Sequence, residues 1–194
     1  LFATHDIHGV FYLKNPTGAD DFVEEIEPYR HSDVGRLLLE YVVDVGDPTH
    51  PTLLDELPYS QPHEDLVVAG ETGYAIYNVF LQLLDMRDPA APRKVGEIDT
   101  DPHYLNRLVF DAPTLYAASE SGLVRYDVSF QMFPVPVATY DAGERGLALA
   151  ERSGTAYLVT ASGLSILDVS QPATIALRAR VDVPGAGEVT LVGS

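Results

Sequence analysis

Three side chains that could share one site recur at nearly equal spacing. His63, His103 and Arg145 follow three aspartates of a repeated motif by 19, 18 and 18 residues. Imidazoles bind divalent metals or exchange protons near neutral pH, and a guanidinium binds carboxylate or phosphate. We therefore expect the three residues to meet at one end of the fold. The most specific chemistry open to them is a metal-assisted hydrolase or lyase reaction.

Polar and aromatic neighbours extend this candidate site. Asp65 offers a carboxylate two residues after His63, and Tyr104 offers a ring beside His103 that could stack on a sugar. The same side chains could instead hydrogen-bond neighbouring loops. We predict that a ligand or partner contacts His63, Asp65, His103, Tyr104 and Arg145, and we assign none of them a catalytic role.

Weaker metal candidates lie elsewhere. His5 and His8 are three residues apart, and such residues do not share a face of a strand. Asp99 and Asp101 offer oxygen ligands, but their spacing does not match an EF-hand calcium loop. A structural calcium is the one ion these acids suggest, and no cofactor is predicted.

The composition excludes several classes of protein. There is no cysteine, so disulfide scaffolds and thiol nucleophiles are excluded. The net charge of −17 disfavours nucleic acid as a partner, and no apolar run reaches the length of a membrane span. Hydrolase, zinc-protease and nucleotide-binding motifs do not occur. No signal-peptide pattern precedes Leu1.

The elements that must position these residues form a fourfold repeat. Each unit has an apolar run that ends in an aspartate, and the four aspartates are 41, 42 and 41 residues apart. Turn residues follow each aspartate, and two further apolar runs precede it in most units. The side chain of a strand-end aspartate is expected to cap its turn. These aspartates are Asp44, Asp85, Asp127 and Asp168.

Four short strands in a unit of about 41 residues are typical of a propeller blade. The sequence therefore predicts an all-β β-propeller with four blades and the first strand of a fifth, as part of a larger ring. The predicted blades cover about 1–58, 66–99, 108–141 and 147–183, and the fifth begins at 189–194. An acidic insertion at 15–35 interrupts the first blade, and residues 19–27 are predicted to form a short helix or ordered loop.

These units resemble the LVIVD repeat, a bacterial and archaeal β-propeller family, with residues 163–172 as the nearest match. The third unit departs, because residues 130–134 replace the short proline turn. The resemblance implies an extracellular, cell-surface or periplasmic protein. It also implies a non-enzymatic interaction or scaffold module that binds a protein partner or sister subunit on an exposed sheet edge or face. Binding of a small ligand or glycan at the channel mouth, and the hydrolase or lyase reaction, remain the alternatives.

Overall fold

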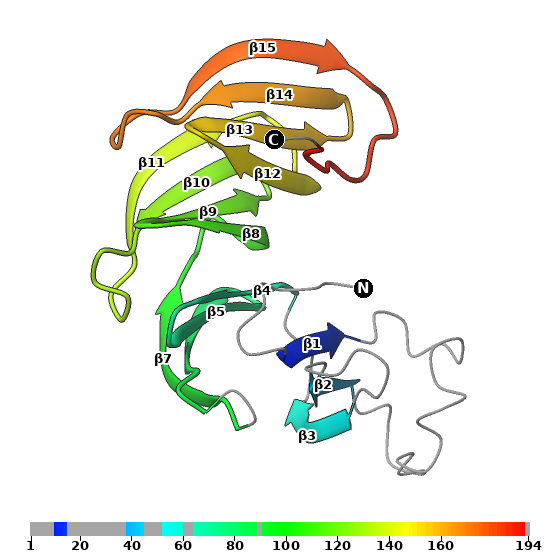
Figure 1. Cartoon of the computed structure of the whole chain (residues 1–194). Coiled ribbons are helices and arrows are strands. Elements are labelled where there is room, and N and C mark those ends of the chain that lie inside the picture. The colour runs from blue at the N-terminus through cyan, green and yellow to red at the C-terminus, as the bar shows by residue number, and fades with distance from the viewer. Residues whose placement is uncertain (1–9, 15–37, 45–51, 60–63, 89–90, 193–194) are drawn as a thin grey trace.

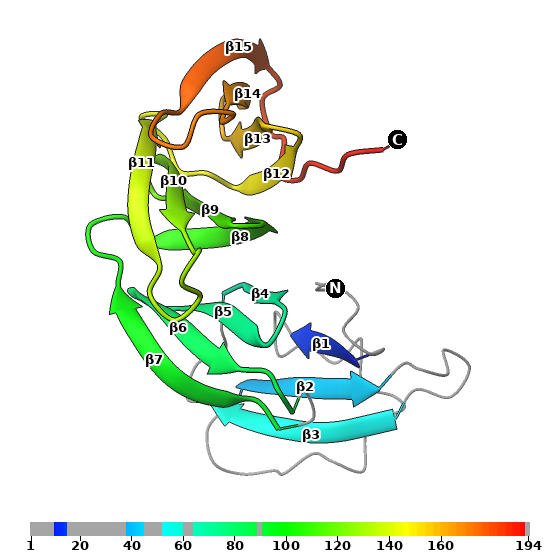
Figure 2. The same cartoon turned by 60° about the vertical axis from the view of Figure 1, so that its left-hand side comes forward.

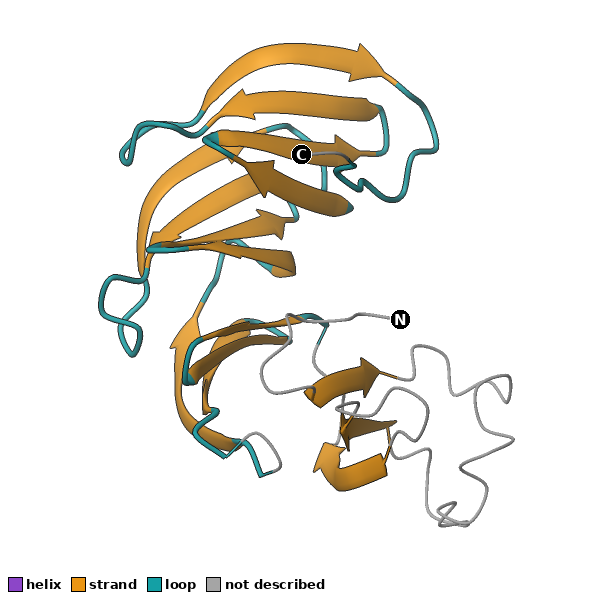
Figure 3. Cartoon of the chain, viewed as in Figure 1, coloured by secondary structure: helices purple, strands orange, loops and turns teal. Residues whose placement is uncertain are grey.

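The computed structural model describes residues 10–14, 38–44, 52–59, 64–88 and 91–192. This part of the chain consists of strands joined by loops and contains no helix (Figure 3). It therefore offers no helix able to cross a membrane. The predicted first strand of the first blade and the predicted helix or loop at 19–27 lie outside the described residues.

Two antiparallel sheets come first along the chain. Sheet 1 has the order β1-β2-β3, with β1 at Val10–Lys14, β2 at Leu38–Asp44 and β3 at Thr52–Tyr59. Sheet 2 has the order β4-β5-β6-β7. Its strands are Leu66–Ala69, Thr72–Tyr77, Phe80–Asp85 and Arg93–Asp99.

Two more four-stranded antiparallel sheets follow with the same connections. Sheet 3 comprises β8 to β11, at Leu105–Asp111, Thr114–Ser119, Gly122–Asp127 and Val135–Asp141. Sheet 4 comprises β12 to β15, at Ala148–Arg152, Thr155–Thr160, Gly163–Asp168 and Ala176–Asp182. The predicted four-stranded, all-β units are thus present in sheets 2, 3 and 4. Figures 1 and 2 show the sheets following one another along an arc.

The strand predicted over 189–194 does not form in the described part of that segment. Residues 187–192 have no strand conformation. A strand exists only when its backbone groups pair with a neighbour, and no described strand pairs with these residues. The prediction that this segment forms an inner strand is therefore not met here.

Apolar side chains fill the spaces between successive sheets. One cluster joins sheet 2 to sheet 3, and a second joins sheet 3 to sheet 4. Because sheet 3 is covered on both faces, all six residues of its strand β9 are buried. The outer strand β15, by contrast, is exposed along its whole length. The core is therefore a series of layers between sheets.

The last two strands of every described sheet share one irregularity. The register shifts by one residue just before the strand-end aspartate, so the outer strand bulges there. A bulge increases twist and makes an edge strand a poorer template for pairing with another chain. The shifts lie at Val42/Val43, Leu83/Leu84, Arg125/Tyr126 and Ile166/Leu167.

Three of the four strand-end aspartates, Asp85, Asp127 and Asp168, lie in fully described turns and cap them, as the sequence predicts. The Asp127 carboxylate accepts hydrogen bonds from the backbone amide and the hydroxyl of Ser129, at 2.8 and 2.6 Å. Asp168 accepts the same pair from Ser170, at 3.0 and 2.6 Å. Asp85 accepts from the side chain and the backbone amide of Arg87. These bonds stabilise the ionised carboxylates.

Acidification should remove this stabilisation. The Ser170 hydroxyl and amide, together with Arg178, lower the pKa of Asp168 from 3.8 to about 2. A lowered pKa means that the contribution is complete above about pH 5 and is lost as the pH falls through 3.8 toward 2. We expect Asp168→Asn to lower the melting temperature near neutral pH, with a deficit that shrinks toward pH 2.

Thermal melts of the wild type and Asp168→Asn between pH 2 and pH 7 check this expectation. Asp182→Asn is the control, because Asp182 lies at the end of the outer strand of the same sheet. A melting-temperature deficit that stays constant down to pH 2 would show that the carboxylate charge plays no part.

Candidate functional site

The structure describes part of the residue set in which the sequence predicts a site. His5, His8 and His63 lie outside the described residues, so their approach to the other candidates is not described. Asp65, His103, Tyr104 and Arg145 all lie in the segments that lead into the first strands of sheets 2, 3 and 4.

The carboxylate of Asp65 fastens two sheets together. Its Oδ1 accepts a hydrogen bond from the amide of Leu66 at 3.0 Å, and its Oδ2 accepts one from the amide of Leu108 at 2.7 Å. Leu66 opens β4 of sheet 2, and Leu108 lies in β8 of sheet 3. One carboxylate therefore holds the first strands of neighbouring sheets at a fixed distance. A hydrogen bond to a neighbouring segment was one of the two roles that the sequence left open for Asp65.

The structure brings His103, Tyr104 and Arg145 together around Glu120, a residue that the sequence did not single out. The Glu120 amide donates to the carbonyls of His103 and Tyr104, at 3.3 and 3.1 Å. The Glu120 carboxylate pairs with the Arg145 guanidinium at 3.2 Å. The turn between β9 and β10 thus organises three of the five predicted residues.

This cluster around Glu120 offers polar recognition on an exposed surface. Arg145 and Glu120 are each about half exposed. The ring of Tyr104 is 45% exposed, on a residue with φ of 37°. An ion pair open to solvent can bind a polar or charged group, but it has little power to shift the proton affinity of a reacting group. The arrangement favours contact over catalysis.

The acids proposed as oxygen ligands belong to a turn. The Asp99 carboxylate accepts a hydrogen bond from the amide of Asp101 at 2.9 Å. The carboxylate of Asp141 accepts the same bond from Gly143 at 2.8 Å, at the equivalent position of sheet 3. Among the described residues, no three histidine, aspartate or glutamate side chains are placed to hold one metal ion.

The sequence did not single out an acidic pair that lies on the first strands of sheets 3 and 4. Burial raises the pKa of Glu151 on β12, and the nearby Asp111 at the end of β8 raises it further. Glu151 also accepts a hydrogen bond from the amide of Gly154 at 2.8 Å. The two acids lie 40 residues apart, which is about one repeat, and this spacing was the available signal.

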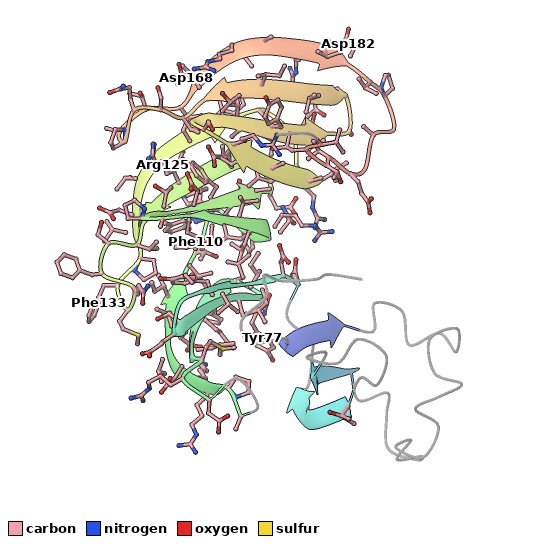
Figure 4. The ribbon with its side chains drawn as sticks, in the orientation of Figure 1. Tyr77, Phe110, Arg125, Phe133, Asp168 and Asp182 are labelled. Atoms are coloured by element: carbon pink, nitrogen blue, oxygen red, sulfur yellow. The ribbon has the colours of Figure 1, made fainter. Side chains whose placement is uncertain are left out.

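Arg125 is another side chain whose structural role the sequence did not reveal. It is 8% exposed and lies between sheets 3 and 4 (Figure 4). Its guanidinium donates to the carbonyls of Val169 and Gln171, at 2.9 and 2.7 Å. It also donates to the Thr114 hydroxyl at 3.2 Å. These bonds hold the turn after β14 against the preceding sheet.

Gln131 performs the corresponding role between sheets 2 and 3. Its carbonyl accepts a hydrogen bond from the Tyr74 hydroxyl at 2.9 Å, and its side-chain oxygen accepts one from Thr72 at 3.0 Å. Its side-chain nitrogen donates to the Ala69 carbonyl at 3.3 Å. The turn after the third strand of a sheet is thus fastened to the preceding sheet at both described interfaces.

The comparisons with known proteins agree with the repeat. The LVIVD repeat matches residues 41–56 and residues 154–183. The first segment spans the end of β2 and most of β3, and the second spans β13 to β15. No curated protein matches the chain.

Among solved structures, the computationally designed Ika4 protein has a similar fold. Its TM-score is 0.56 at 9% identity, and the match covers 70% of this chain and 82% of that protein. At this level of identity the likeness shows the fold alone. The two segments that the family model matches show that the chain contains LVIVD repeats.

Proposed function

We propose that this chain is a non-enzymatic interaction module built from propeller blades and exposed at the cell surface or outside the cell. The LVIVD repeat makes it a repeat-based module. Sheets 2, 3 and 4 have the strand order of blades, and each packs on the next through an apolar layer. These sheets span residues 66–99, 105–141 and 148–182.

The observation that carries the proposal is an apolar loop between β10 and β11. Phe130, Met132 and Phe133 are 79%, 42% and 73% exposed. Residues 128–140 contain no charged side chain, although the whole chain carries −17. Exposed apolar patches on a soluble protein commonly mark interaction sites. Figure 4 shows the Phe133 ring pointing away from the sheets.

The loop is held in a fixed shape. Gln131 ties its middle to sheet 2, and the amide of Phe133 donates to the carbonyl of Phe130 at 2.7 Å. Ser129 ties its start to Asp127. A loop that is ordered before binding loses less conformational entropy when it binds. We infer that it inserts into an apolar pocket of a partner protein.

The test is binding of the labelled full chain to intact cells of the organism that makes it. We expect saturable binding, and we expect Phe130→Ser with Phe133→Ser to weaken it by at least about tenfold. The control is Val95→Ser, which changes an apolar residue of β7 that is 48% exposed. Absence of saturable binding, or equal binding by the loop variant, would contradict the proposal.

A further inference from the structure

The chain has two methionines, and their surroundings differ. Met132 lies in the loop between β10 and β11 and is 42% exposed. Met86 directly follows β6 and is 3% exposed, in an apolar cluster of sheet 2. A Cβ built on Gly73 of β5 would lie 3.1 Å from the Met86 sulfur, so this sulfur packs closely against the neighbouring strand. One thioether is therefore open to solvent, and the other is enclosed.

An exposed thioether reacts with peroxides. The chain contains no cysteine, so its oxidisable sulfur atoms are those of the two methionines. A lone pair of the sulfur attacks one peroxide oxygen, and the S–O bond forms as the O–O bond breaks. The displaced hydroxide takes the proton of the transferred oxygen and leaves as water. The sulfur loses two electrons and the peroxide gains them, so the products are methionine sulfoxide and water.

Met132 occupies the tip of the apolar loop on which the proposed function depends. The amide of Phe133 donates to the carbonyl of Phe130 at 2.7 Å, so residues 130–133 form one turn with Met132 at its third position. Phe130 and Phe133, at the two ends of this turn, are 79% and 73% exposed. A partner that covers both rings must therefore also cover the thioether between them in sequence.

Oxidation of Met132 changes the polarity of this loop but not its attachment. A sulfoxide is polar, and residues 128–140 offer no charged side chain with which it could pair. Burying an unpaired polar group in an apolar pocket costs free energy. The loop is attached to sheet 2 through Gln131, which bonds to Tyr74 and Ala69, and these bonds do not use the Met132 sulfur. The shape of the loop should therefore survive while its apolar contact is weakened.

We propose that Met132 is a modification site for hydrogen peroxide, and that the sulfoxide formed there releases the partner bound by the apolar loop. The inference rests on the interaction function proposed above, because it describes how binding through that loop is switched off. Met86 keeps its thioether under the same conditions, since its sulfur is enclosed. The fold of the oxidised chain is therefore that of the unmodified chain.

The first measurement locates the oxidised sulfur. The full chain is treated with hydrogen peroxide, catalase stops the reaction at set times, and tandem mass spectrometry of the digested protein finds the added oxygen. We expect Met132 to gain one oxygen at least about tenfold faster than Met86, because Met86 reacts only when its cluster opens. The melting temperature of the chain oxidised at Met132 should equal that of the untreated chain. Equal oxidation rates at the two methionines would overturn the inference.

The second measurement compares binding of the labelled full chain to intact cells of the organism that makes it, before and after peroxide treatment. We expect the oxidised chain to bind at least about tenfold more weakly. Methionine sulfoxide reductases for both sulfoxide epimers, with dithiothreitol, should restore the original affinity. Dithiothreitol has no disulfide to reduce in a chain without cysteine. Recovery therefore assigns the loss of binding to a sulfoxide.

Two conservative substitutions assign the effect to one sulfur. Met132→Leu keeps an apolar side chain of similar volume that peroxide does not oxidise. The affinities of this variant before and after peroxide should agree within about twofold, whatever its affinity relative to the wild type. Met86→Leu is the matched control at the enclosed position. Peroxide should weaken the binding of Met86→Leu as much as it weakens that of the wild type.

The outcomes separate this inference from the proposed function. Unchanged binding after complete oxidation of Met132 would overturn the inference and leave the interaction function in place. An equal effect of peroxide on Met132→Leu and on the wild type would also overturn it, because another group would then be responsible. If the untreated chain shows no saturable binding to cells, the proposed function fails, and the release of a partner by oxidation fails with it.

Discussion

Gly163→Ala is expected to lower the free energy of unfolding by about 3 kcal/mol or more. Gly163 begins β14 with φ of 154°, a value that L-residues rarely adopt. A Cβ built there would lie 2.2 Å from the carbonyl oxygen of Val181 and 2.9 Å from the amide nitrogen of Val183. Both atoms belong to the backbone next to β14, so relief of the clash requires the outer strand to move.

The control separates this clash from the effect of φ alone. Gly143 has φ of 70°, but a Cβ there meets no atom within 4 Å. Gly143→Ala should therefore cost only about 1 kcal/mol, the usual penalty of a left-handed conformation. Urea titrations of both variants measure the difference. Equal losses of stability would show that the outer strand yields freely and that the close approach is unimportant.

The second large effect is expected from Arg125→Leu, with a loss of about 3 kcal/mol. Leucine is the residue at the equivalent position of sheet 2, where Leu83 packs in the apolar layer. The substitution therefore keeps an apolar side chain that this type of sheet accepts. It leaves the carbonyls of Val169 and Gln171 and the Thr114 hydroxyl without the guanidinium donor.

Two further variants test whether the hydrogen bonds of Arg125 or its charge is responsible. Arg125→Lys keeps the charge but lacks the planar fork of donors, so most of the loss should remain. Arg178→Ala removes an arginine that is 47% exposed and pairs with Asp168, and it should cost less than about 1 kcal/mol. If Arg125→Leu lowered the free energy of unfolding no more than Arg178→Ala does, the hydrogen bonds of Arg125 between sheets 3 and 4 would not stabilise the fold.

The repeat and its strands were predictable because they depend on neighbours in sequence. Each apolar run that ends in an aspartate became the next-to-last strand of a described sheet, and the carboxylates of Asp85, Asp127 and Asp168 cap their own turns within two residues. Alternation and turn residues act over such short distances. The exception is the segment at 189–192, which has an apolar pattern but no strand conformation.

The candidate site was predictable only in part. His103, Tyr104 and Arg145 are linked only through Glu120 in the described structure, by two backbone carbonyls and one ion pair. Their common partner Glu120 lies in a turn of the same repeat unit, and nothing in its local sequence distinguishes it from an ordinary solvent-exposed acid. Asp65 differs from them. The sequence predicted that it contacts a ligand or partner, and in the structure its carboxylate accepts hydrogen bonds from the backbone amides of two neighbouring sheets.

The sequence by itself therefore determined the repeat, the strands of sheets 2, 3 and 4, and the aspartates that end the next-to-last strands of the described sheets. Only the tertiary structure decided how one repeat holds the next. Arg125 contacts Val169 and Gln171, which are more than 40 positions away, and Gln131 reaches back about 60. The physical reason is distance along the chain. Turns and alternation are set by adjacent residues, whereas contacts between sheets depend on stacking, which brings distant residues together only after the strands have formed.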